Sequence, residues 1–391
     1  MAVNVIQEEK IMKKIFASMM AAAMVVALAG CSNNGADSSS AADSGSTAGT
    51  AESGATASTA ESGATAGTAE SGANTGDSTG AHKLGMGVVT SIGSSSAGNA
   101  QVDATVAAVI LDADGKIVSC AVDVAQNKMD ITDGEVPEDA ASMTFKSKKE
   151  KLEEYNMKPA SGIGKEWYEQ AEAFEAYVVG KTADEVAAIP VETTENGHVV
   201  TTDETLLAGC TMSINSLIDA TVKACNDDSA ADFNGDAKLE LTCSTSVDSA
   251  TASAEDGEDG TAAMYTSFAA VAVDADGKLA AVCYDEVQPK VTFDDEGEIT
   301  SDTAAEIKTK REKKDEYGMR SASGISAEWF EQNQAFETFV TGKTADEISA
   351  IPTETTDNGH VVTTDETLKA GCTMSVGGMI KTVVKAMGLA G

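Results

Sequence analysis

The chain has 391 residues, with 63 acidic side chains against 27 basic ones and a formal net charge of −36 at pH 7. This excess of negative charge argues against nucleic acid and anionic lipid surfaces as partners. Aromatic residues make up only 4% of the chain. We therefore expect small cores built from Ala, Val, Ile and Met.

The first segment is typical of a secretory signal peptide. Two lysines precede a short apolar run at residues 15–28, which ends with Leu-Ala-Gly directly before Cys31. A charged start, a short apolar stretch and small residues before the cut define such a peptide. The cysteine after Leu-Ala-Gly resembles a bacterial lipobox, in which lipid is added to Cys31. We predict that residues 1–31 are a lipoprotein signal peptide, that translation starts at Met12, and that lipid anchors the chain to the outer face of the cell membrane.

Residues 32–82 consist almost wholly of Ser, Ala, Gly, Thr, Asp and Glu. They show no apolar periodicity, so they cannot bury enough surface to offset the entropy of ordering. We expect a disordered tether. A flexible coil of about 50 residues reaches roughly 40 Å.

The remainder of the chain contains an internal duplication. Residues 146–211 and 308–373 match without a gap at a shift of 162, and 46 of 66 positions are identical. At about 150 residues each, the copies have the size of whole domains. We therefore expect a first domain at 83–226, a linker at 227–235 and a second domain at 236–391.

The first half of each copy combines a strand hairpin with helices. In the first copy, apolar runs at 102–111 and 116–124 flank the turn sequence Asp-Ala-Asp-Gly at 112–115, which predicts a β-hairpin. Residues 146–155 are charged and prone to form a helix. Residues 164–179 carry apolar side chains at helical spacing and end at a glycine.

The second half of each copy begins with a Thr-Ala-Asp-Glu capping box at 182–185, which predicts a short helix. Asn-Gly lies at the centre of residues 191–202 and predicts a second hairpin. Ser213 is expected to cap a final helix over 214–225. The sequence thus predicts an α+β fold built twice, with an antiparallel sheet plus helices in each copy.

The segment before the final helix is the candidate binding site. It reads Ala-Gly-Cys-Thr-Met-Ser at 208–213 and again at 370–375. A glycine lets the backbone turn sharply or approach a ligand closely. The threonine lies just ahead of a helix N-terminus, where free N–H groups and the helix dipole favour a phosphate. The predicted binding residues are Gly209, Thr211, Ser213, Gly371, Thr373 and Ser375.

These motifs resemble the FMN-binding domain family. That family includes flavin subunits of sodium-pumping reductases and the tandem-domain flavin lipoproteins of Gram-positive extracellular electron transfer. Its members carry an Asp-Gly-Lys-Ile strand hairpin, matched here at 114–117 and, as Asp-Gly-Lys-Leu, at 276–279. The resemblance implies FMN as cofactor and, through a flavin transferase, a phosphoester to Thr211 or Thr373.

Two positions depart from the family pattern. The usual Ser-Gly-Ala-Thr is Ala-Gly-Cys-Thr in both copies, and the acidic residue expected six positions before the threonine is Thr205 or Thr367. Three alternatives therefore stay open, namely covalent flavin, noncovalent flavin and a domain without flavin.

The leading functional hypothesis is a surface lipoprotein that carries electrons between a membrane reductase and an external acceptor. Such a protein is a carrier and not a complete enzyme, because the redox chemistry belongs to the cofactor. The alternative is a non-redox binding or structural lipoprotein that keeps the fold without flavin.

Other residues have less specific explanations. Trp167 and Trp329, each followed by a second aromatic residue, are able to stack on a flavin ring, but their helical spacing favours the core. His198 and His360 follow Asn-Gly, which indicates exposed turn residues and not a metal site. Cys225 and Cys243 flank the linker and are a candidate disulfide between the domains.

Overall fold

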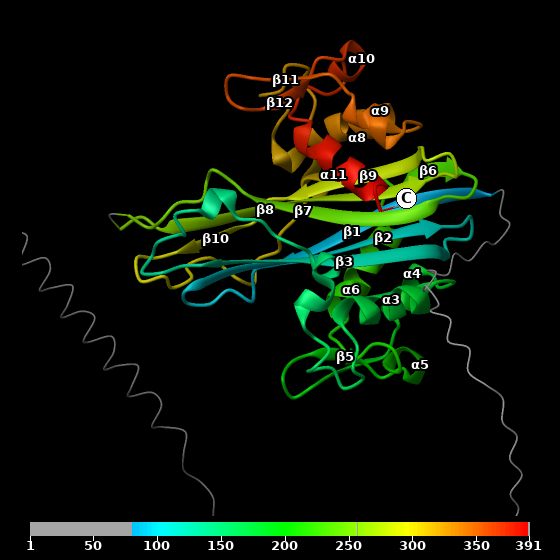
Figure 1. Ribbon diagram of the computed structural model, residues 1–391, viewed down its shortest axis with the longest axis vertical. Helices are drawn as coiled ribbons and strands as arrows, with labels where there is room; N and C mark the ends of the chain where they lie inside the picture. Colours follow the sequence, from blue (N-terminus) through cyan, green and yellow to red (C-terminus); the bar gives the residue numbers. More distant parts are fainter. Residues whose placement is uncertain (1–79, 256, 390–391) are drawn as a thin grey trace, which may run out of the picture. The chain divides into compact units, whose positions relative to one another are not determined.

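The structure, a computed structural model, describes residues 80–255 and 257–389. The predicted signal peptide, Cys31 and nearly all of the predicted tether lie outside this part of the chain. Among the described residues, no helix is both long and apolar enough to cross a membrane. The elements form a mixed α+β fold with antiparallel sheets (Figure 1), as the sequence predicts.

The two copies have closely similar successions of elements. The first copy runs β1 (Ala81–Ser91), β2 (Asn99–Leu111), β3 (Ile117–Asp130), η1 (Ala140–Ser142), α2 (Lys148–Lys151), η2 (Leu152–Tyr155), α3 (Trp167–Val178), α4 (Ala183–Ala187), β4 (Val191–Thr193), β5 (Val199–Thr201), α5 (Glu204–Leu207) and α6 (Asn215–Cys225). After β6 (Ala231–Asn234), the second copy runs β7 (Lys238–Val247), β8 (Gly260–Val273), β9 (Leu279–Val287), β10 (Lys290–Phe293), α7 (Lys310–Lys313), η3 (Lys314–Tyr317), α8 (Trp329–Val340), α9 (Ala345–Ser349), β11 (Thr353–Thr355), β12 (Val361–Thr363), α10 (Glu366–Lys369) and α11 (Gly377–Met387).

Each copy contributes one main antiparallel sheet. The first sheet has the order β3-β2-β1-β6, and β6 comes from the stretch that the sequence assigned to a linker. In the second sheet, β8 lies between β7 on one side and β9 with β10 on the other. Together β9 and β10 take the place of the single strand β3. Pro289 separates them, because proline has no N–H to donate to the neighbouring strand.

The helices cover the outer face of each sheet. In the first copy, α3, α4 and α6 enclose an apolar core over β2 and β3, and α8, α9 and α11 do the same in the second copy (Figure 1). Two glycines of β1 allow α6 to approach closely. A Cβ on Gly85 would lie 2.1 Å from the carbonyl oxygen of Ala224, and one on Gly87 would lie 2.3 Å from that of Ala220.

The inner faces of the two sheets pack against each other and bury a core that both copies share. Its largest side chains include Leu84 and Met86 from β1, Ile110 from β2, and Leu241 and Phe268 from β7 and β8. Leu84 and Phe268 have no exposed surface. The two duplicated units therefore contact each other through a sheet-on-sheet interface of the β-sandwich kind.

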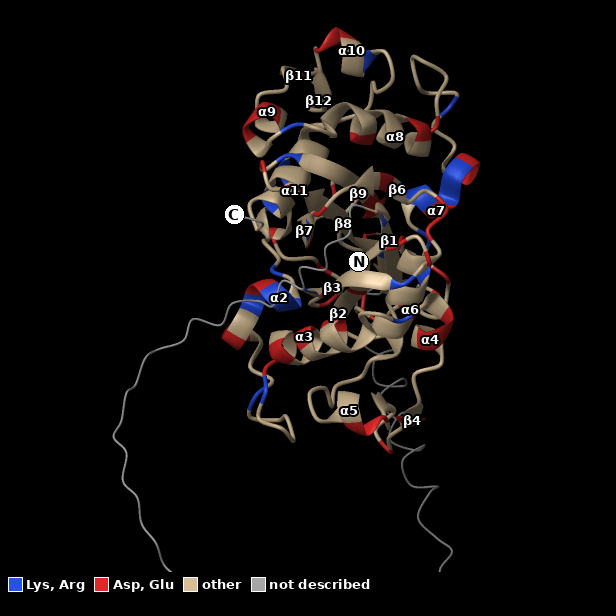
Figure 2. Cartoon of the chain, turned by 90° about the vertical axis from the view of Figure 1, so that its right-hand side faces the viewer, with Lys and Arg blue, Asp and Glu red and all other residues tan. Residues whose placement is uncertain are grey.

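Two equivalent ion pairs cross between the copies. The ammonium group of Lys223 on α6 lies 2.7 Å from the carboxylate of Glu312 on α7, and Lys385 on α11 lies 2.6 Å from Glu150 on α2. A shift of 162 residues converts one pair into the other. The copies are thus related in the way that two subunits of a symmetric dimer are related. Figure 2 marks the basic residues of α2 and α7 in blue.

The structure confirms most of the predicted elements. The hairpin of β2 and β3, the helix α3, the capping box of α4 and the hairpin of β4 and β5 all form. The predicted cap of the last helix is wrong. Ile214 occupies the N-cap position of α6 without a side-chain hydrogen bond, while the Ser213 hydroxyl accepts a hydrogen bond from the N–H of Val199.

The shared core predicts that the two copies unfold together. Phe268→Ala should destabilise the chain by about 3–5 kcal/mol, because it removes a large buried side chain and leaves a cavity. Each copy holds one tryptophan, Trp167 or Trp329, so fluorescence of the two single-tryptophan variants reports the copies separately. Both denaturant transitions should move by the same amount. A transition that moves only for Trp329 would contradict the shared core, and the exposed substitution Leu152→Ala is the control.

Candidate functional site

Each candidate threonine is held by a buried glutamine from the first long helix of its copy. The N–H of Thr373 donates to Oε1 of Gln332 over 2.8 Å, and the Thr373 hydroxyl donates to the same oxygen over 3.3 Å. The N–H of Met374 is a third donor at 3.2 Å. Thr211 and Met212 make the equivalent three hydrogen bonds to Gln170.

The glutamine amide is also fixed on its donor side. The Nε2 group of Gln332 donates to the Ser323 hydroxyl and to the Ala327 carbonyl, both over 3.1 Å. Gln170 does the same with Ser161 and Lys165. Both glutamines are at most 1% exposed. Each therefore connects the loop before α3 or α8 with the loop before α6 or α11, and it fixes the threonine backbone between them.

The two candidate glycines serve helix packing. A Cβ on Gly209 would lie 2.7 Å from the Cβ of Ala173, and one on Gly371 would lie 2.8 Å from that of Ala335. Neither glycine has a positive φ. The glycines do allow another group to approach the backbone closely, as the sequence predicts. That group is an alanine of a helix in the same copy, Ala173 or Ala335.

The two candidate serines fasten the loop to the small hairpin. The Ser213 hydroxyl accepts from the Val199 N–H over 3.0 Å and donates to Oδ1 of Asn215 over 3.3 Å. In the second copy the Ser375 hydroxyl accepts from the Val361 N–H and donates to its carbonyl, both over 3.3 Å. As a result, α6 and α11 begin without a side-chain cap, and each runs for 11 residues.

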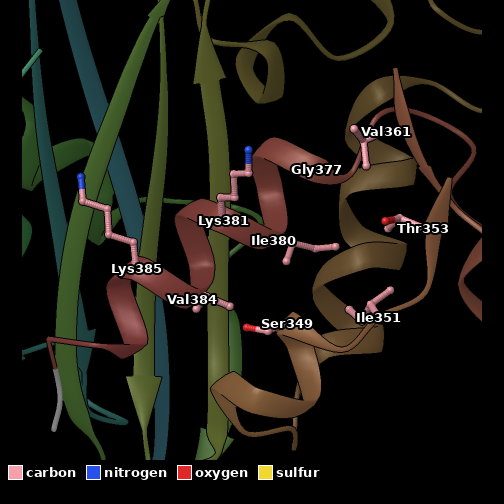
Figure 3. A pocket seen from close by; sticks show the side chains of 9 residues that line it. All are labelled: Ser349, Ile351, Thr353, Val361, Gly377, Ile380, Lys381, Val384 and Lys385. Atoms are coloured by element: carbon pink, nitrogen blue, oxygen red, sulfur yellow. The ribbon is translucent and has the colours of Figure 1, made fainter. Parts of the chain in front are cut away.

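A groove of about 490 Å³ begins at the start of α11 (Figure 3). Its volume lies in the range of small-molecule sites, about 300–1,000 Å³. Ile380 and Val384 on α11 face Ile351 and Val361 across the groove, and the side chain of Lys381 leaves α11 on a different side from Ile380 (Figure 3). The first helical residue, Gly377, lines the groove as well and follows Thr373 by four positions.

The groove residues differ between the copies at the charged position. Lys381 in the second copy corresponds to Asp219 in the first copy. Lys385 is already paired with Glu150, whereas Lys381 has no ion-pair partner among the described residues. The second copy therefore has the positive charge of Lys381 on the helix that begins without a cap. The equivalent helix of the first copy has the negative charge of Asp219 at this position.

The structure confirms that the two tryptophans are core residues and that the two histidines are exposed turn residues. Trp167 and Trp329 are 3% and 2% exposed and belong to the two outer cores. Tyr168 lies at the surface side of α3, where its hydroxyl donates to Glu153 over 3.2 Å. His198 and His360 are exposed in the turns of the small hairpins.

A buried group of charges lies elsewhere, between the strand hairpin and α7. Asp285 accepts hydrogen bonds from the N–H groups of Glu286 and Arg311, and Glu337 accepts one from the N–H of Tyr284. Burial raises the pKa of Asp285 to about 7, against the opposing effect of the Arg311 charge. Asp123, Lys149 and Glu175 repeat the arrangement in the first copy. These groups are satisfied by backbone and by one another, which indicates a structural role.

Comparison with known proteins shows one partial similarity. No family model matches the chain, and no solved structure matches it. A stretch of 93 residues is 39% identical to a protein described as chlorophenol reductase from Desulfitobacterium hafniense. The match covers 21% of this chain and 28% of that protein.

The glutamine contacts predict a specific loss of stability. Gln332→Met leaves the N–H groups of Thr373 and Met374 buried without an acceptor, at a cost of about 1–3 kcal/mol each. Amide hydrogen exchange at residues 373 and 374 should accelerate, and the free energy of unfolding in denaturant should fall. Gln334→Met on the exposed side of the same helix is the control. Equal effects of the two substitutions would rule out the proposed contacts.

The buried carboxyl group predicts a pH dependence. Asp285 binds a proton more readily in the folded than in the unfolded state, so its contribution to stability falls as pH rises from its ordinary value of 3.8 to about 7. This fall in the free energy of unfolding amounts to a few kcal/mol, and it should be absent in Asp285→Asn, because the amide does not titrate. Unfolding midpoints measured from pH 4 to 7 should therefore diverge between the wild type and this variant. Parallel curves for the wild type and the variant would refute the assignment.

Proposed function

We propose that the protein is a surface lipoprotein that binds FMN in its second copy and carries electrons outside the membrane. The proposal is supported by the groove at the start of α11, with its apolar walls, its lysine and its uncapped helix N-terminus. Thr373 does not line the groove itself but precedes the lining residue Gly377 by four positions. Apolar walls suit a flat aromatic ring, while N–H groups at a helix start and a nearby ammonium suit a phosphate.

The hydrogen bonds from the backbone of Thr373 and Met374 to Gln332 can stay in place when such a ligand binds. If the phosphate is esterified to Thr373, the hydroxyl no longer donates to Gln332, and one hydrogen bond of 3.3 Å is lost. The two backbone donors to Gln332 remain. The loss of one neutral hydrogen bond costs only about 1 kcal/mol. Either noncovalent binding or attachment by a flavin transferase is therefore compatible with the local structure.

The chain's own residues would hold and orient the cofactor. Ile380 and Val384 would contact the ring from one side, Ile351 and Val361 from the other, and Lys381 would offset the phosphate charge. When bound, FMN supplies one- and two-electron transfer, which the polypeptide itself does not. The lipid on Cys31 and the tether would place this copy within reach of a membrane reductase and an external acceptor.

The first copy is less suited to a phosphate. Asp219 replaces Lys381 there, and a carboxylate beside the phosphate would repel it. We propose that Thr373, and not Thr211, is the attachment site if flavin is covalent. The alternative function, a binding or structural lipoprotein without flavin, predicts that neither copy binds FMN.

The test uses the full chain, produced in its native bacterium and also titrated with FMN after purification without flavin. Denatured protein from the bacterium should carry flavin fluorescence, with a mass increment on the peptide that contains Thr373. Thr373→Val should abolish the increment, and Thr211→Val should leave it unchanged. In the titration, Lys381→Asp should raise the Kd about tenfold, equivalent to about 1.4 kcal/mol. Unmodified peptides together with no binding in the titration would exclude the flavin function.

A further inference from the structure

One edge of the second sheet lacks a strand that the first sheet has. In the first copy, β6 pairs with the outer edge of β1, so that Asp232 lies opposite Lys83 and Ala231 lies opposite Leu84. The corresponding strand of the second copy is β7, which pairs with β8 on one side. Among the described residues, no strand pairs with the other side of β7. The second copy therefore has an open edge where the first copy has a covered one.

The strand register shows which residues of the two edges correspond. Leu84 of β1 pairs with Ile110 of β2, and Leu239 of β7 pairs with Ala272 of β8. Since Ile110 and Ala272 are equivalent at the shift of 162, the two leucines are equivalent as well. A lysine precedes the leucine in both strands. The start of β7 is therefore the counterpart of the part of β1 that β6 covers.

The open edge presents backbone groups that lack a partner. The carbonyl oxygen of Cys243 on β7 accepts a hydrogen bond from the ammonium group of Lys385 over 2.7 Å, which marks the outer side of the strand. Because backbone groups alternate between the two sides of a strand, those of Leu239 and Leu241 point the same way. Neither has a hydrogen-bond partner on that side among the described residues. Such groups are a template for pairing with a further strand.

Exposed apolar side chains lie at the same edge. Leu389 is 49% exposed, and its carbonyl oxygen accepts a hydrogen bond from Lys238 at the start of β7. Val118 is 39% exposed and belongs to β3, which packs against β7 across the sandwich. A cavity of about 230 Å³, lined by Lys238 and by Met387 at the end of α11, opens beside them. The edge therefore offers both backbone groups and apolar surface to a partner.

The first copy shows the same positions when the edge is covered. Leu389 and Val118 correspond to Asp227 and Ala280 at the shift of 162. The carboxylate of Asp227 accepts a hydrogen bond from the N–H of Met86 on β1, and Ala280 belongs to β9, against which β6 packs. A charged and a small residue thus border the covered edge, whereas two large apolar residues border the open one.

The start of β7 has the same residue pattern as the strand that it lacks. β6 reads Ala-Asp-Phe at 231–233, with the aspartate opposite Lys83, the phenylalanine in the shared core and the alanine packed against that core. β7 reads Leu-Glu-Leu at 239–241, with both leucines in the shared core. Opposite charges that face each other across antiparallel strands stabilise the pairing. A second β7 therefore fits the open edge, with its glutamate opposite Lys238.

We infer that two copies of this chain associate through β7, with the two strands antiparallel about a two-fold axis. Leu239 then lies opposite the same residue of the other chain, and Lys238 of each chain lies opposite Glu240 of the other. Within one chain these two side chains already form an ion pair at 3.1 Å, so both are oriented along this edge. The second sheets of the two chains become one continuous antiparallel sheet, and the same surface serves on both sides of the contact.

Two features limit this association. The pairing is confined to the start of β7, because Lys385 occupies the carbonyl group of Cys243 further along the strand. The net charge of −36 on each chain opposes contact between two copies, and salt screens that repulsion. The inference does not rest on the proposed flavin, since none of the residues 238–241 lines the groove.

The test measures the mass of the full chain by sedimentation equilibrium over a range of concentrations at high salt. The chain carries Cys31→Ser, so that lipid does not drive association. We expect an equilibrium between monomer and dimer. Lys238→Glu places glutamates opposite each other at both contacts, and Glu240→Lys places lysines there. Because like charges directly opposite each other are destabilising, each variant alone should associate about tenfold more weakly.

The matched control is an equimolar mixture of these two variants. Each mixed pair has opposite charges at both contacts, so the mixture should recover the association of the parent chain although neither variant does so alone. Glu195→Lys, in the exposed turn of the β4–β5 hairpin, changes the net charge as much as Glu240→Lys and should leave association unchanged. A chain that stays monomeric at every concentration overturns the inference. So does a dimer that the two variants do not weaken, or a mixture that associates no better than its components.

Discussion

The burial of one sheet face against another is the constraint on which the rest of the molecule depends. Because the inner faces of the two sheets share a core, only the outer faces remain for helices. The loops that carry Thr211 and Thr373 are attached to those helices through Gln170 and Gln332. The sandwich therefore fixes two equivalent positions, one on the outer side of each sheet, and separates them by the full thickness of both.

On this common frame the two copies have diverged at the residues that decide chemistry. The glutamine contacts, the close-packed glycines and the capping boxes are the same in both. The groove lysine of one copy is an aspartate in the other. Such a difference matters for function, because function depends on the residues of a site and not on the fold that carries them.

The sequence predicted the elements but not how they pack. Periodicity and turn residues were sufficient for the hairpin of β2 and β3 and for α3, because these signals are local. The shared core was missed, although the unbroken apolar run at 106–111 is typical of a strand buried on both faces. Gln170 was missed too. It lies on the same helix face as Trp167 and Phe174, so a polar residue in the apolar stripe of both copies was the available signal. Ser213 was assigned as a cap because residue type alone does not reveal that Val199 already occupies its hydroxyl.

A crystal structure of the full chain isolated from its native bacterium and supplied with FMN would show whether the second copy holds the cofactor. We expect electron density for the ring between α11 and the β11–β12 hairpin, with the phosphate near Lys381 and the start of α11. Density at Thr211 alone, or a groove that contains only solvent at saturating FMN, would contradict it.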